Sequence, residues 1–161
     1  MQKGMTKGTL ILIVLVTGWW APPLTVSRAA ADEPPFRYTG GTMWLPQNCK
    51  GKLEINSEAM VFACQDDSFS IPYKSVVLMQ YGSNLSRKVR KMKLRWKVKP
   101  EFVDPLFGGK KRRYFTVVYK DDGATGALVL QVAPAAMRPY LAEIDLKVGQ
   151  RVEVERFDNE N

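Results

Sequence analysis

Histidine is absent from the 161-residue sequence. Since histidine is the commonest general base and a common zinc ligand, its absence excludes histidine-based catalytic triads and most zinc sites. No serine is followed three residues later by lysine, no Gly-x-Ser-x-Gly occurs, and Gly108-Gly109-Lys110 lacks the leading glycine of a phosphate-binding loop. We therefore expect a binding protein with no catalytic residues, no metal and no cofactor.

Paired aspartates, candidates for acid–base chemistry, occur at Asp66-Asp67 and Asp121-Asp122. Both pairs stand where the chain is expected to turn. Aspartate favours turns because its side chain bonds to the nearby backbone, so we interpret both pairs as turn formers.

Long apolar runs are also scarce, and the one that stands out lies near the start of the chain. Lys3 and Lys7 precede 12 residues, Thr9 to Trp20, that are too few to cross a bilayer of about 30 Å as a helix. Residues 1–31 therefore have the order of a signal peptide, with cleavage after Ala31 or, alternatively, after Ala29. We expect export to the periplasm or the medium, with no transmembrane span in the mature chain.

Cysteine occurs only twice, at Cys49 and Cys64. An even pair in an exported protein favours a disulfide, and two buried free thiols are the alternative. Lys52–Ile55 and Met60–Cys64 are predicted to form a hairpin with its tip at Asn56-Ser57, a register that places the two cysteines opposite each other. No Cys-x-x-Cys supports a redox role.

Acidic residues are in the minority, with 16 Asp and Glu against 24 Lys and Arg, a net charge of +8. Three of the basic residues lie in the predicted signal peptide, so residues 32–161 carry 21 and a net charge of +5. This excess favours contact with anionic lipid, an anionic envelope polymer or nucleic acid, or serves only solubility. Nucleic acid is the least favoured partner, because the basic residues are interleaved with too few aromatic stacking platforms.

Short runs of β-branched and aromatic residues, separated by Pro and Gly, predict a mainly β domain. Residues 32–48 are expected to hold a linker, Asp32–Tyr38, and a leading strand, Thr42–Leu45, before a domain that spans 49–161. Asp121-Asp122-Gly123 supplies the turn of a second hairpin. Besides the hairpin described above, strands are predicted at Phe69–Ile71, Ser75–Tyr81, Tyr114–Tyr119 and Ala127–Val132.

One helix is predicted, after Pro134, and Gly149 is placed to end it. Pro139 fits this helix only if it lies in the first turn. Arg151–Glu155 then alternates and predicts a brief closing strand. The apolar stripe of the helix consists of Met137, Tyr140, Leu141, Ile144 and Val148.

This order of elements resembles the small bacterial pleckstrin-homology-like (PH-like) or GRAM-like proteins over roughly residues 49–155. The resemblance implies a partly open antiparallel β-barrel capped by one C-terminal α-helix, and a protein that binds phosphoinositides, peptides or proteins. The eukaryotic members place basic residues in the loop between their first two strands, whereas the corresponding turn here is Asn56-Ser57-Glu58. The matching residues are Gly51-Lys52-Leu53, Val61-Phe62, Phe69–Tyr73, Val76-Val77, Tyr81-Gly82, Lys110–Phe115 and Val148-Gly149.

The most unusual stretch runs from Arg87 to Lys99, and within it, from Lys91 onward, cations alternate with apolar residues at a period of two. An extended ribbon with one charged face and one apolar face is therefore predicted. The charged face either binds anions, with Trp96 as an interface anchor, or protects a sheet edge from aggregation while Trp96 packs in the core. The cations are Lys91, Lys93, Arg95, Lys97 and Lys99, and Lys110, Lys111, Arg112 and Arg113 are expected to extend the same surface.

The sequence therefore favours a non-enzymatic exported binding or scaffold module whose cationic surface contacts an anionic membrane or an envelope polymer. The alternative is a protein–protein interaction subunit of the cell envelope that uses a sheet edge or the groove beside the helix. Salt distinguishes the two, because binding through solvated charges weakens with ionic strength and apolar docking does not.

Overall fold

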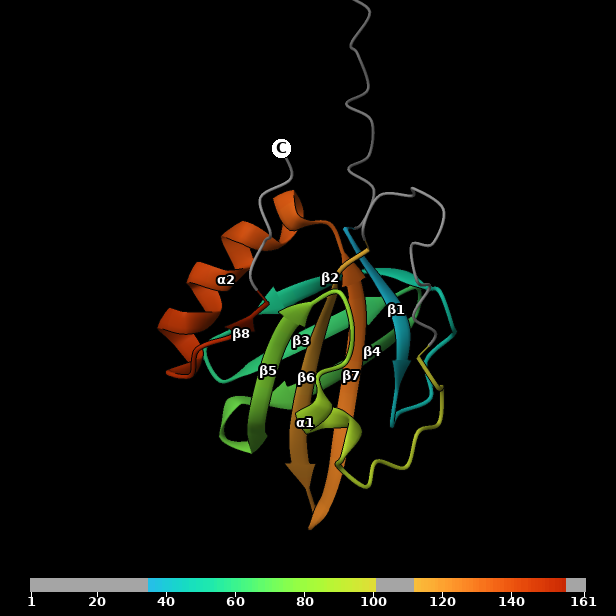
Figure 1. The fold of residues 1–161 in the computed structure, drawn as a ribbon. Helices are drawn as coiled ribbons and strands as arrows, with labels where there is room; N and C mark the ends of the chain where they lie inside the picture. The colour runs from blue at the N-terminus through green and yellow to red at the C-terminus, as the bar shows by residue number, and fades with distance from the viewer. Residues whose placement is uncertain (1–34, 101–111, 156–161) are drawn as a thin grey trace, which may run out of the picture. The chain divides into compact units, whose positions relative to one another are not determined.

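Two antiparallel meanders and one long helix make up residues 35–100 and 112–155, the part of the chain that the structure, a computed structural model, describes (Figure 1). The predicted signal peptide, residues 1–31, lies outside the described residues. The elements are β1 Phe36–Gly41, β2 Lys50–Ile55, β3 Ala59–Cys64, β4 Asp67–Pro72, a 3₁₀ turn Tyr73–Ser75, β5 Val76–Gly82, α1 Arg87–Arg90, β6 Tyr114–Asp121, β7 Ala124–Val132, α2 Pro134–Val148 and β8 Glu153–Val154.

The strands form one open sheet in the order β4-β3-β2-β1-β7-β6-β5-β8. Neighbouring strands are antiparallel except β5 and β8, whose pairing is parallel and short. β1 pairs with β2 on one side and with β7 on the other, so it joins the β1–β4 meander to the β5–β7 meander. The prediction of a mainly β fold with one main helix near the C-terminus is confirmed.

The main core lies between the two meanders, because β2, β3 and β4 pass behind β5, β6 and β7 (Figure 1). The ring centroids of Phe69 on β4 and Tyr119 on β6 are 5.6 Å apart across this core. α2 contributes Met137 and Ile144, which are fully buried. Tyr140 packs edge-on against Phe36 of β1, with 4.9 Å between ring centroids. The helix therefore packs on both the core and the joining strand.

α2 begins at Pro134 and ends at Gly149, whose φ of 68° places it in the left-handed region that glycine adopts without strain. The predicted apolar residues face the core or are half-buried, and Leu146 stays exposed. The sequence predicted that Pro139 would fit this helix only in its first turn. The structure instead places Pro139 inside the helix, beyond that turn. It is exposed, so its ring costs the helix a hydrogen bond without disturbing the core.

The β6–β7 hairpin has the predicted turn. Asp122 and Gly123 have φ values of 44° and 78°, the pair of positive values that a two-residue type I′ hairpin turn requires. The first strand, by contrast, was predicted in the wrong place. It is β1, at Phe36–Gly41, where the sequence indicated a linker, and Thr42–Leu45 is not a strand. β1 is hard to recognise from sequence because its alternation stops at two glycines and its main partner, β7, is far away in the sequence.

Cys49 and Cys64 form the predicted disulfide, with 6.0 Å between Cα atoms and both residues buried. The register used to predict it is wrong by two residues, because Ile55 pairs with Met60 rather than with Glu58. A shift of two keeps every side chain on its own face of the sheet. Cys64, at the end of β3, is therefore bonded to a residue that is not directly opposite it. That residue is Cys49, which ends the loop after β1 and immediately precedes β2.

We expect Cys49→Ala/Cys64→Ala to lower the free energy of unfolding by about 3 kcal/mol, because the bridge closes a loop of about 15 residues in the unfolded chain. Urea unfolding of the oxidised protein and of the double variant measures the difference. Equal stabilities would show that the bridge does not restrict the unfolded chain.

Two buried tyrosines predict a loss of stability at high pH. Burial raises the pKa of Tyr38 and of Tyr81 to about 12, against an ordinary value of 10.0. The unfolded chain releases these protons at lower pH than the folded one, so stability is full below about pH 10 and falls as the pH rises towards 12. Urea unfolding across this range, with Tyr81→Phe as control, measures it. The control should lose less stability, and a flat profile for the wild type would contradict the burial effect.

Candidate functional site

The basic segment, Arg87–Lys99, lies over the outer face of β5, β6 and β7, on the side away from the main core (Figure 1). Its first four residues form α1, which Ser86 caps by accepting a hydrogen bond from the Val89 amide. The rest turns at Lys91 and Met92 and then runs without regular secondary structure, and it pairs with the sheet only where Val98 bridges to Gly41. The predicted alternation of exposed and half-buried side chains is present, but the segment is neither a regular strand nor the edge of the sheet.

Apolar side chains fix the basic segment to the sheet. Val89 is fully buried, and Met92, Leu94 and Trp96 pack on a second core cluster that includes Val118 and Val129. Trp96 is therefore half-buried against the sheet. Of the two roles predicted for Trp96, an interface anchor or a packed side chain, its contacts with this cluster favour the second.

The far end of the basic segment is held by the backbone of β1. Gly41 donates to the Val98 carbonyl at 2.9 Å and accepts from the amides of Lys97 and Val98 at 2.9 and 3.1 Å. A Cβ at Gly40 would stand 2.6 Å from the nitrogen of Pro100, so this close approach requires glycine. The segment is thus attached at both ends and along its apolar side.

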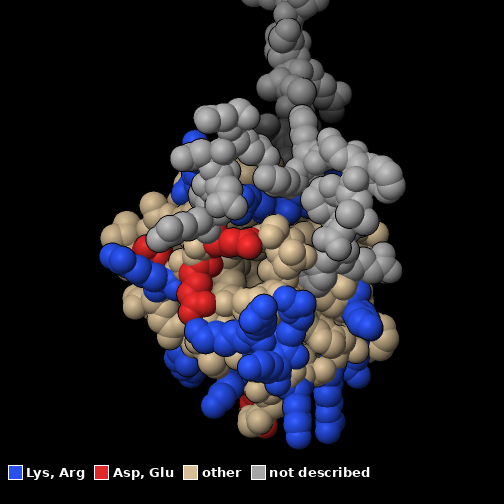
Figure 2. Space-filling view, viewed as in Figure 1, with Lys and Arg blue, Asp and Glu red and all other residues tan. Residues whose placement is uncertain are grey.

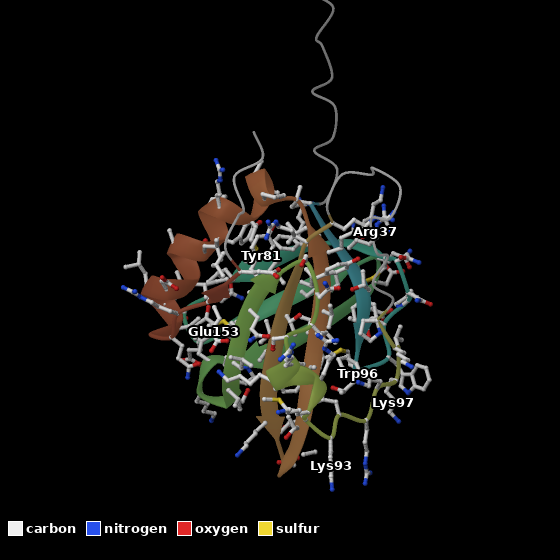
Figure 3. All side chains as sticks on the ribbon, viewed as in Figure 1. Arg37, Tyr81, Lys93, Trp96, Lys97 and Glu153 are labelled. Carbon is white, nitrogen blue, oxygen red and sulfur yellow. A yellow bond between two sulfur atoms is a disulfide. The ribbon has the colours of Figure 1, made fainter. Side chains whose placement is uncertain are left out.

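Because the apolar side faces the sheet, the alternating cations must face solvent. All five are exposed, and none forms an ion pair within residues 35–100 and 112–155. Figure 2 shows basic side chains gathered over the lower part of the view, and Figure 3 shows Lys93 and Lys97 pointing away from the sheet. The five are Lys91, Lys93, Arg95, Lys97 and Lys99.

Trp44, which the sequence analysis missed, is the exposed aromatic residue beside these cations. It is 73% exposed, and the Lys97 ammonium lies 5.6 Å from its ring centroid. Its neighbour Leu45 is buried, and Met43 is half-buried. Exposure rises from Met43 to Trp44 and falls again at Leu45, but a pattern this short cannot be identified from the sequence alone.

A groove of about 750 Å³ separates the basic segment from the β6–β7 hairpin. Lys93, Arg95 and Lys97 line it from the segment, and Asp121 and Asp122 line it from the hairpin turn. Three positive and two negative side chains therefore border the same space.

Hydroxyl groups contribute to the lining of this groove. The hydroxyls of Thr42 and Tyr119 are hydrogen-bonded at 3.2 Å, and the Ala127 amide donates to the Thr42 hydroxyl at 3.0 Å. Burial raises the pKa of Tyr119, which the hydrogen bond to Thr42 partly offsets, so its hydroxyl is neutral at ordinary pH. The Tyr119 ring lies against Gly126, where a Cβ would overlap it. The hydroxyls offer neutral hydrogen-bonding groups between the charged walls.

The second predicted basic cluster does not extend the first within the described residues. Arg112 is exposed and Arg113 half-buried, at the start of β6, whereas the groove lies at the opposite end of that strand. Eight residues of strand span about 25 Å, so these arginines and the groove cations form separate surfaces. Lys110 and Lys111 lie outside the described residues.

At α1 one of the three cations, Lys88, is paired. Lys88 contacts Glu153 of β8 at 2.7 Å, and Gln80 donates to the same carboxylate at 2.7 Å. These hydrogen bonds hold the pKa of Glu153 below its usual value. Figure 3 marks Glu153, and Figure 2 shows acidic side chains in this region. Lys88 thus differs from the five alternating cations, which have no ion-pair partner among the described residues.

Comparison with known proteins adds no assignment: no protein-family model, no curated protein and no solved structure matches the chain. Among the described residues no helix combines the length and apolar character of a membrane span. The geometry of the basic segment is thus the basis for a functional proposal.

The two tryptophans should respond differently to substitution. Trp96→Ala removes packing on the outer sheet face and should lower the free energy of unfolding by about 2 kcal/mol or more. Trp44→Ala removes an exposed ring and should change it by less than about 0.5 kcal/mol. Urea unfolding of both variants tests this, and equal losses would contradict the burial of Trp96.

Proposed function

We propose that the chain is a non-catalytic exported module that attaches to an anionic membrane surface through the basic segment. The observation that carries this is the juxtaposition of five exposed cations, without ion-pair partners in the described residues, and the exposed ring of Trp44. Cations of a soluble domain that serve only solubility need no aromatic residue among them.

Both parts of this surface have a physical role at a membrane. Each Lys or Arg near an anionic bilayer contributes about 1 kcal/mol, and the attraction falls off within about 8–10 Å at physiological salt. Tryptophan is enriched at membrane–water interfaces because its ring is apolar and its indole N–H is polar. Trp44 lies close enough to Lys97 for one surface to present both groups.

The PH-like resemblance forms part of this proposal. The order of the two meanders, their joining through β1 and β7, and α2 packed against the core support a partly open barrel of that kind. The loop between the first two strands is Thr42–Cys49, not the Asn56-Ser57-Glu58 turn inferred from sequence. It carries Trp44 and no acidic residue, so the acidic turn is no longer an obstacle to lipid contact at that loop.

Export is likewise a proposal. The Cys49–Cys64 disulfide is consistent with an oxidising compartment, where such bonds form and persist. The basic head, apolar run and small residues of 1–31 supply the expected signal.

A protein–protein role for the same domain has one supporting observation. β4 ends the sheet, and its outer edge has no partner strand among the described residues. A partner strand docked there would bind through backbone hydrogen bonds and would be little affected by salt.

Co-sedimentation of residues 32–161, disulfide intact, with phosphatidylglycerol-containing and purely phosphatidylcholine vesicles tests the membrane proposal. We expect binding only to the anionic vesicles, weakened at physiological salt compared with low salt. Changing Lys93, Arg95, Lys97 and Lys99 to Gln should reduce the affinity about tenfold or more.

The matched control changes four other exposed cations, Lys52, Lys74, Arg138 and Arg151, to Gln. It has the same net charge and should bind nearly as tightly as the wild type. If the two quadruple variants bind alike, net charge and not the basic segment is responsible, and if the wild type binds neither vesicle the membrane proposal is wrong.

A further inference from the structure

The groove beside the basic segment contains more than positive charge. A surface built only to attract anions gains nothing from carboxylates, because each repels the ligand that the cations attract. Yet Asp121 and Asp122 border the same groove as Lys93, Arg95 and Lys97. Neither aspartate forms an ion pair within residues 35–100 and 112–155. Both signs are therefore available to a ligand.

The two charged walls are held apart by the fold. The aspartates stand on a tight hairpin turn whose backbone is fixed by positive φ at Asp122 and Gly123. The cations stand on a segment whose apolar side chains are packed on the sheet and whose end is bonded to Gly41. Both supports are attached to the same strands, and no ion pair joins the two walls within residues 35–100 and 112–155. A ligand that carries both a negative and a positive charge would pair with both walls at once.

We propose, on the basis of the membrane-binding function above, that this groove binds a phosphoethanolamine group, with its phosphate on the cationic wall and its ammonium on Asp121 and Asp122. The phosphate oxygens accept hydrogen bonds from Lys93, Arg95 and Lys97, charge-assisted contacts that are stronger than neutral ones. The hydroxyls of Thr42 and Tyr119 lie between and offer further hydrogen bonds.

Other headgroups fit the groove less well. Phosphatidylglycerol supplies the negative charge but leaves both carboxylates facing a hydroxyl instead of a cation. Phosphocholine carries a positive charge, but its quaternary nitrogen has no N–H to donate to a carboxylate. The primary ammonium of phosphoethanolamine donates three hydrogen bonds, as lysine does. The mixed charge of the groove therefore favours phosphatidylethanolamine over phosphatidylcholine at equal membrane charge.

Vesicles with one fixed fraction of phosphatidylglycerol, diluted with either phosphatidylethanolamine or phosphatidylcholine, test this preference. We expect the wild type to bind the phosphatidylethanolamine vesicles about fivefold more tightly or better. Asp121→Asn/Asp122→Asn should abolish the preference while binding the phosphatidylcholine mixture at least as tightly as the wild type, since it removes repulsion from the anionic lipid. Asparagine tolerates the positive φ of residue 122, so the turn is kept.

The matched control is Glu54→Gln/Glu58→Gln, which removes the same charge from exposed residues outside the groove lining. It should keep the preference. A wild type without preference, or a preference that survives in Asp121→Asn/Asp122→Asn, overturns the proposal while leaving anionic membrane binding intact.

Titration with soluble O-phosphoethanolamine, followed by nuclear magnetic resonance, tests whether the groove binds this group when it is free in solution and not part of a membrane lipid. If no vesicle binds but the soluble compound shifts signals of the groove residues in the wild type and not in Asp121→Asn/Asp122→Asn, the membrane function fails and the zwitterion site stands, with a free ligand. If neither vesicles nor the soluble compound binds, both proposals are wrong.

Discussion

The pairing of β1 on both of its edges is the constraint on which the rest of the structure depends. Through β2 it carries the first meander and through β7 the second, so the core between them exists only when both ladders form. The same strand also ends at Gly41, whose backbone holds the basic segment. The disulfide reinforces this region, because Cys49 accepts a hydrogen bond from the Tyr38 amide of β1 and is bonded to the end of β3.

The position of the cationic surface results from the burial of apolar side chains on the sheet, and not from contacts between charged side chains. In an extended chain alternate side chains point to opposite sides, so packing Leu94 and Trp96 on the outer sheet face obliges Lys93, Arg95 and Lys97 to project into solvent. The apolar residues supply the stability and the cations supply the surface. Trp44 reaches the same surface from another loop, and only the fold brings it to Lys97.

Part of the fold and of the candidate site could be predicted from sequence, because those features depend only on residues that are neighbours in the chain. The Asp122-Gly123 turn, the helix from Pro134 to Gly149 and the alternation of Lys91–Lys99 each depend on neighbouring residues. What could not be predicted is non-local. Phe36 pairs with Val132, the hairpin register depends on the loop before Ala59, and the groove arises where the β6–β7 turn meets the basic segment. For Trp96 the sequence left both exposure and packing open, because it does not say which aromatic ring the outer sheet face covers.

The long sequence separation between β1 and β7 has a consequence for how the chain acquires its structure. Contacts between distant segments form late, since closing a long loop costs entropy before any pairing is gained. Any process that delivers the chain with its N-terminus first leaves Phe36–Gly41 with one partner strand until Ala124–Val132 has followed. The protein therefore completes its sheet only after Ala124–Val132 has emerged, and until then the first meander must persist as an incomplete domain, held by the disulfide and its own hairpins.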